Sequence, residues 1–204
     1  MNQINNRNSL KESVSKYVME LFKEKLPDWA QYHDIWHTVE TVKGCEEIGS
    51  ASFLSEEDLE ILYIAAWFHD TGYIYQADGH EEKSVEITSE FLNTLDYPKE
   101  KITEVVKCIL ATKISNHPNN LIESVICDAD LISLGKDDYL QKNNLLKREM
   151  ELRENKKLSE GEWLKRSLNF LLSYKYYTEY ARHHYDNQLK INIRNLEEML
   201  KSYI

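Results

Sequence analysis

LEILYIAAWFHDTG, the stretch from Leu59 to Gly72, determines how the rest of this 204-residue chain has to fold. Its first ten residues are apolar on almost every side, which predicts a buried, central helix. The stretch then ends in His69 and Asp70. A desolvated carboxylate beside an imidazole is costly unless a cation or several hydrogen-bond donors pair with it. A bound metal ion would satisfy both side chains, so we expect further ligands elsewhere in the chain.

The composition favours an all-α fold, a compact bundle of helices with the metal site in its core. Hydrophobic residues make up 42% of the chain and charged residues 29%, and six glycines and three prolines are too few for many short strands. The formal net charge of -10 argues against binding to polymeric nucleic acid or to an anionic membrane, but it does not exclude a small anionic substrate. The sequence shows no signal-peptide pattern and no long apolar run, which predicts a cytoplasmic protein.

The cysteines suggest no other kind of scaffold, and no linker divides the chain. Cys45, Cys108 and Cys127 lie far apart without CxxC spacing, so we expect reduced core thiols and no disulfide framework or zinc ribbon. The chain has no repeat and no low-complexity linker. We therefore expect one helical domain over residues 1–204, with the core motifs in 32–134 and C-terminal helices in 135–204 packed on them.

Two histidines precede the apolar stripe of the next predicted helix. His33 and His37 are four residues apart, so they share one face if helical geometry holds between them. A single histidine near an apolar stripe is usually a satisfied core residue. Two at ligand spacing, in a chain that also carries the HD pair, favour a metal site.

A carboxylate lies on the apolar stripe of the helix predicted over 121–134. Asp130 follows Ile126 by four residues and so lies in the same column. An unpaired aspartate buried there would be strongly destabilising, and a metal ion would remove that difficulty. Asp128 lies off the stripe, where we expect it to cap or orient a neighbouring segment.

Three motifs together resemble the HD superfamily of metal-dependent phosphohydrolases: YHDIWHTVETV, AAWFHDTGY and ICDADLISLG, the first in the YHxxxHxxxV form of one subgroup. The resemblance covers the chain from about Tyr32 through the final helices. It implies hydrolysis of a small phosphoester, such as a nucleotide, by a metal-activated water that Asp70 orients while His33 protonates the leaving oxygen. It implies one or two divalent ions (Mn, Fe, Mg, Ni, Co or Zn), the first held by His37, His69, Asp70 and Asp130.

The resemblance also implies less specific roles for three other residues. His80 stands where two-metal members of the superfamily bind a second ion, although a helix start decorated with acids explains the segment equally well. His117 could complete that second site or could be an exposed loop histidine. Lys113 follows a helix where the superfamily places residues near the substrate, so it could bind phosphate charge, the alternative being an exposed lysine.

The C-terminal third gives weaker signals. Charges dominate from Asp137 to Lys157, including Glu149, which predicts a largely solvated helix. The aromatic run YKYYTEYARHHYDNQ could stack a nucleobase, although tyrosines at this density more often seal a helix against the core. A homodimer through the C-terminal helices also stays open.

Two other functional classes remain open from the sequence. The chain could be a sensor that binds a cyclic nucleotide in an HD pocket without turnover. It could also be a structural helical protein whose histidines are merely buried, although the intact set of His37, His69, Asp70 and Asp130 argues against this.

Overall fold

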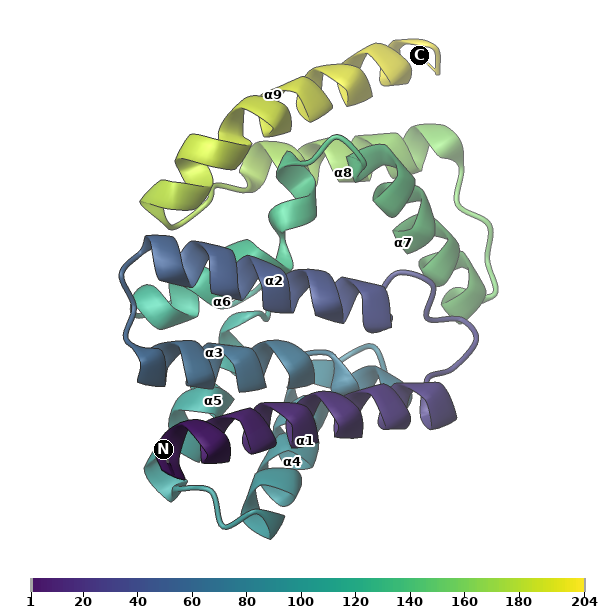
Figure 1. Ribbon diagram of the computed structural model, residues 1–204. Helices are drawn as coiled ribbons and strands as arrows, with labels where there is room; N and C mark the ends of the chain where they lie inside the picture. Colours follow the sequence, from purple (N-terminus) through teal and green to yellow (C-terminus); the bar gives the residue numbers. More distant parts are fainter. Residues whose placement is uncertain (1, 204) are drawn as a thin grey trace.

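The computed structural model describes residues 2–203, which form a bundle of helices (Figure 1) with no strand in that range. The all-α prediction is therefore confirmed. Two short 3-10 helices, η1 (Thr71–Ile74) and η2 (Ile132–Gly135), follow the HD pair and Asp130 closely. The α-helices in chain order are α1 (Asn2–Lys25), α2 (Ile35–Ala51), α3 (Glu56–Phe68), α4 (His80–Thr94), α5 (Lys99–Ala111), α6 (Leu121–Asp130), α7 (Tyr139–Glu154), α8 (Glu160–Ser173) and α9 (Glu179–Lys201).

The predicted central helix is α3, which packs against α1, α2, α5 and α6. It begins with a capping box, in which Ser55 and Asp58 each bind the other's backbone N–H. Ile64, Ala65 and Phe68 are fully buried, as expected for a helix that is apolar on nearly all sides. The helix therefore delivers the two residues that follow it, His69 and Asp70, into the interior.

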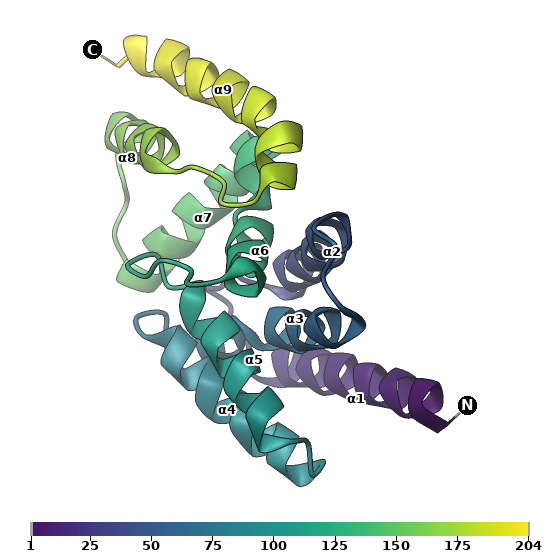
Figure 2. The same ribbon diagram turned by 90° about the vertical axis from the view of Figure 1, so that its left-hand side faces the viewer.

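The helices lie in three groups along the molecule (Figure 2): α7, α8 and α9 at one end, α2, α3 and α6 in the middle, and α1, α4 and α5 at the other end. Asp128 of α6 joins the middle group to the start of α9. Its two carboxylate oxygens accept the backbone N–H groups of Tyr177 and Thr178 at 2.8 and 2.7 Å. Asp128 thus orients the N-terminus of α9, the kind of role expected for it from the sequence.

The charged segment after Asp137 folds as α7, but the prediction of a largely solvated helix is wrong for one of its faces. Tyr139, Asn143 and Glu149 are buried. The reason is that this face of α7 lines a cavity and contacts the loop before α2: Glu149 accepts backbone N–H groups of that loop, and Asn143 Oδ1 accepts the Ser167 hydroxyl.

The expectation of reduced core thiols agrees with the structure. Cys45, Cys108 and Cys127 are buried, free thiols. Within residues 2–203, no helix has the length and apolar character that crossing a bilayer requires.

Candidate metal centre

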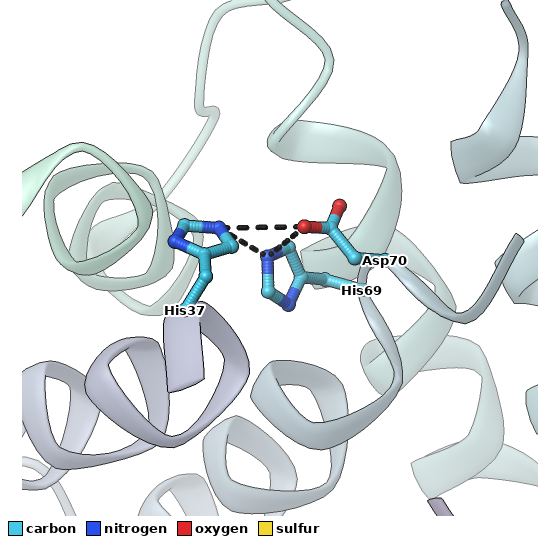
Figure 3. Close-up of side chains that lie close together, drawn as sticks. All are labelled: His37, His69 and Asp70. Carbon is cyan, nitrogen blue, oxygen red and sulfur yellow. Dashed lines mark hydrogen bonds and ion pairs between the residues drawn. The ribbon is translucent and has the colours of Figure 1, made fainter. Parts of the chain in front are cut away.

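Three side chains from two elements point toward one another in the core (Figure 3): His37 of α2, and His69 and Asp70 at the C-terminal end of α3. Asp34 caps α2 and its Oδ1 accepts the backbone N–H of His37 at 3.0 Å, which fixes the first turn. The Nε2 atoms of His37 and His69 lie 3.3 Å apart, and Asp70 Oδ2 lies 3.3 and 3.1 Å from them respectively. One ligand atom from each residue therefore converges on a common centre.

A hydrogen bond from the other ring nitrogen of His69, Nδ1, determines that Nε2 faces this centre with a lone pair. His69 Nδ1 lies 2.8 Å from the backbone oxygen of Ala66, so in the neutral ring Nδ1 carries the proton and donates it there. Its Nε2 then presents a lone pair to the Nε2 of His37. Two ring nitrogens facing each other at this distance require a proton or a cation between them, and a metal-bound imidazole has this same arrangement.

Asp70 Oδ2 also fits a cation at the centre. This oxygen is buried and accepts no assigned hydrogen bond among the described residues, and the two histidine nitrogens lie within ion-pair distance of it. A buried carboxylate oxygen without hydrogen bonds is stabilised by a cation beside it, either a protonated histidine or a metal ion. Imidazole nitrogens and carboxylate oxygens are ligands that divalent first-row metals accept, so the residues present fit such an ion.

Two further predicted residues lie beside the cluster. Asp130 Oδ1, at the end of α6, is 3.0 Å from His37 Nε2 and 3.4 Å from His69 Nε2. His80, the first residue of α4, places its Nε2 3.3 Å from Asp70 Oδ1, the oxygen opposite the one that the other two histidines share. Its Nδ1 lies 2.7 Å from the backbone oxygen of Ala77, which again leaves Nε2 as the lone-pair nitrogen.

The electrostatics of the cluster favour a positive charge at its centre. Burial lowers the pKa of His37, but contacts with Asp130 and Asp70 outweigh it and raise this pKa to about 9. The same two carboxylates raise the pKa of His69 well above its ordinary value against the effect of burial. Burial raises the pKa of Asp70, but the histidines reverse the shift and lower it well below the usual range. The carboxylates therefore stay ionised and attract either protons or a metal ion.

His33 reaches the cavity by a route other than the predicted shared helical face. Because α2 begins at Ile35, His33 precedes the helix, yet its ring centroid is 5.6 Å from that of His37. The His33 ring stacks on Tyr73 with centroids 4.2 Å apart, and the Tyr73 hydroxyl lies 3.3 Å from His33 Nε2. On the other side, His33 Nδ1 lies 2.5 Å from Glu149 Oε1.

Glu149 is the functional candidate that sequence reasoning missed. Its Oε2 accepts the backbone N–H groups of Tyr32 and His33 at 2.9 and 3.0 Å, so one carboxylate holds the loop before α2 and orients the His33 ring. Glu149 lies in a run of charged residues that hides it. The apolar residues Tyr139, Leu146 and Met150 do recur at helical spacing there, and they are the signal that could have revealed a buried face.

The cluster borders a cavity of about 630 Å³. Asp70, His80 and Asp130 line it, together with side chains of α7 and α8. Two predicted residues are not brought to it. Lys113 pairs with Glu82 outside the cavity lining, and His117 is exposed in the loop before α6. Tyr73, which follows the HD pair in η1, is a buried wall of the cavity.

Comparison with known proteins agrees with the helical fold and with the resemblance drawn from the three motifs. The family model of the HD domain matches residues 34–135, half of the chain, and the protein therefore belongs to the HD domain family, as the three motifs predict. No curated protein matches the sequence.

Two solved structures share the fold over nearly the whole chain. One is a predicted HD superfamily hydrolase from an uncultured Thermotogales bacterium, at 20% identity and a TM-score of 0.61, covering 93% of this chain and 92% of that one. The other is Bacillus subtilis YpgQ in complex with ADP, at 16% identity and a TM-score of 0.65, covering 96% of both chains. At these identities the likeness concerns the fold.

Proposed function

We propose that this protein is a metal-dependent phosphohydrolase that acts on a nucleotide or another small phosphoester. The observation that carries the proposal is the buried cluster of His37, His69 and Asp70, which borders a cavity and includes a carboxylate oxygen without an assigned hydrogen bond among the described residues. Membership in the HD domain family and the fold shared with an HD superfamily hydrolase support this reaction class. The ADP in the YpgQ structure supports a nucleotide as the substrate.

The residues that would hold the first ion are His37, His69, Asp70 and Asp130, and His80 would contribute to a second. A divalent ion bound there would polarise a phosphoryl oxygen and supply an activated water for attack on phosphorus. The mixture of two imidazoles with carboxylates favours a first-row transition metal over Mg²⁺, which prefers an all-oxygen shell.

The protein side chains around the cluster then have separate tasks. Asp70 Oδ1, which faces His80, would orient the attacking water, and His33, carrying a proton on each ring nitrogen, would give the one on Nε2 to the leaving oxygen. Glu149 would hold His33 in that orientation through the Nδ1 contact. Lys113 is paired with Glu82 and would have to leave it to reach a phosphate, so we assign it no direct contact with the substrate.

The first test is elemental analysis of the purified protein and of the variants His69→Ala and His117→Ala. We expect one or two equivalents of a divalent metal in the wild type, loss of metal in His69→Ala, and no change in His117→Ala, whose side chain is exposed. Phosphatase and phosphodiesterase assays with added Mn²⁺ should then show hydrolysis by the wild type that His69→Ala lacks. No metal in the wild type would refute the site, and stoichiometric metal with nucleotide binding but no product would favour the cyclic-nucleotide sensor.

A further inference from the structure

Side chains of α7 and α8 form a polar floor in the same cavity that the proposed chemistry does not use. Trp163 of α8 lines this floor and is only 4% exposed. Its indole Nε1 is buried and has no hydrogen-bond acceptor among the residues that the structure describes. A buried N–H without an acceptor is unfavourable, so a ligand that offers an acceptor here gains an interaction that the protein does not provide.

Other polar side chains on the same floor are arranged so that donors predominate. The Ser167 hydroxyl donates to Asn143 Oδ1 at 3.0 Å, and both residues are buried and line the cavity. Because Oδ1 of Asn143 accepts this bond, its NH₂ group is the part left for a ligand. The floor between α7 and α8 therefore suits hydrogen-bond acceptors on the bound molecule.

The surroundings of this floor favour a flat, electron-rich group. Leu146, Met150 and Phe170 line the cavity and offer apolar and aromatic contact, and Arg166, which also lines it, lies over the Trp163 ring at 6.0 Å. Glu149, which lies between Leu146 and Met150 in the sequence and also lines the cavity, is already bound to His33 and to two backbone N–H groups. A planar heteroaromatic group with ring-nitrogen or carbonyl acceptors matches both the donors and the apolar wall.

The cavity is large enough for one ligand to contact both this floor and the metal centre. Asp70 and Asp130 line the same cavity as Trp163, and its volume of about 630 Å³ lies within the range of pockets that enclose ligands of nucleotide size. We propose that the floor between α7 and α8 is a nucleobase subsite, in which Trp163 Nε1–H and the Asn143 amide donate to acceptor atoms of the base. This inference rests on the proposed function, since it places the ester phosphate of the same molecule at the metal centre.

The test compares Trp163→Phe with a matched control, Trp67→Phe. Trp67 is also a buried tryptophan whose Nε1 has no acceptor among the described residues, but it lies in α3 and does not line the cavity. The probes are the common nucleoside 5′-monophosphates and ribose 5-phosphate, which lacks the base. We expect Trp163→Phe to raise KM for the preferred nucleotide about 10-fold, the loss of one buried hydrogen bond, with KM for ribose 5-phosphate unchanged. Trp67→Phe should leave the ratio of the two KM values unchanged.

A binding measurement without turnover separates this inference from the proposed reaction. Calorimetric titration of the EDTA-treated protein with free nucleosides should detect binding that Trp163→Phe weakens about 10-fold. If Trp163→Phe does not fold, Asn143→Asp takes its place. This variant keeps the side-chain shape and the acceptor of the Ser167 bond but removes the NH₂ donors, so it should weaken nucleoside binding. Nucleoside binding without any hydrolysis would support the subsite and refute the proposed function. Hydrolysis with equal KM for nucleotide and ribose 5-phosphate, and no nucleoside binding, would overturn the subsite alone.

Discussion

Glu149 and His33 are 116 residues apart in the chain, yet Oε1 of Glu149 lies 2.5 Å from Nδ1 of His33. Burial raises the pKa of Glu149, but its bonds to the His33 ring and to the backbone N–H groups of His33 and Tyr32 outweigh this and lower the pKa. An ionised carboxylate at this position fixes the proton of His33 on Nδ1 and directs Nε2 toward Tyr73 and the cavity.

Replacing Glu149 by Gln should therefore damage catalysis more than binding. The amide still fits the space, but it cannot hold the His33 ring with a negative charge, and loss of such an orienting carboxylate typically costs 10- to 100-fold. We expect kcat to fall by roughly this factor, with the metal content and KM nearly unchanged. Glu151→Gln is the control on the same helix, because that side chain binds Lys157 and the Leu158 N–H instead. An equal fall in both variants would show that the effect is general to α7.

Asp130 and Asp128 lie two residues apart on α6 and should respond oppositely to the same substitution. Asp130→Asn removes one charge from the cluster around His37 and His69, so bound metal should drop below stoichiometric amounts after dialysis. Asp128→Asn should keep its metal, because Asp128 contacts the start of α9 and not the cluster. Elemental analysis of the two variants measures both outcomes, and full metal occupancy in Asp130→Asn would remove Asp130 from the ligand set.

Asp128 should instead govern the stability of the fold. It accepts bonds from the backbone N–H groups of Tyr177 and Thr178 and from the hydroxyl groups of Thr178 and Tyr174. Asp128→Ala leaves these donors unpaired in the interior, so the free energy of unfolding should fall by about 3 kcal/mol or more. Burial raises the pKa of Asp128 in spite of its donors, so a neutral acceptor is tolerated and Asp128→Asn should cost about 1–2 kcal/mol. Urea denaturation measures both values, and equal losses would contradict this order.

The metal-free protein should lose stability as the pH rises through the titration of His37. The folded pKa of about 9 lies above the ordinary value of 6.5, so the stabilisation is complete below pH 6.5 and is lost toward pH 9. It is on the order of 3 kcal/mol, at about 1.4 kcal/mol for each pKa unit. The contribution of Asp130, whose pKa is lowered, is present above its ordinary value of 3.8 and is lost as the pH falls further.

Unfolding midpoints between pH 4 and 9, in EDTA and in Mn²⁺, test this dependence. In EDTA the unfolding midpoint should decrease as the pH rises from 6.5 to 9. In Mn²⁺ it should rise over the same range, because the ion displaces the protons from the histidines. Parallel curves under the two conditions would contradict competition between protons and metal for one site.

A substitution at Gly72 should disturb His80 through the backbone. A Cβ atom at Gly72 would lie only 2.0 Å from the backbone oxygen of His80, so η1 and the start of α4 approach each other too closely for any side chain. Gly72→Ala should move His80 away from Asp70 and lower the stability of the protein. Gly161→Ala, where the nearest atom to a new Cβ is a tyrosine side chain at 3.3 Å, is the milder comparison. Thermal unfolding followed by circular dichroism measures the difference in stability between the two variants.

The parts of the site that the sequence predicts are those whose ligands sit on periodic apolar helices. His69 and Asp70 follow an apolar run, and Asp130 lies on an apolar stripe, so each stands out as a polar group in a buried column. Glu149 and Trp163 could not be assigned in the same way. Glu149 lies among other charges, and Trp163 looks like any core aromatic until its indole nitrogen is seen to lack an acceptor. Both depend on how α7 and α8 pack against the rest of the chain, which is a long-range property.

The metal ligands and the α7–α8 wall of the cavity are encoded by separate stretches of the chain. All four proposed ligands of the first ion fall within residues 34–135, whereas Glu149 and Trp163 fall in α7 and α8. Substitutions in α7 and α8 can therefore change which ester is accepted while the metal ligands stay intact. Relatives that share the histidine and aspartate set are consequently free to diverge in substrate, and the residues that report such divergence are those facing the cavity from α7 and α8.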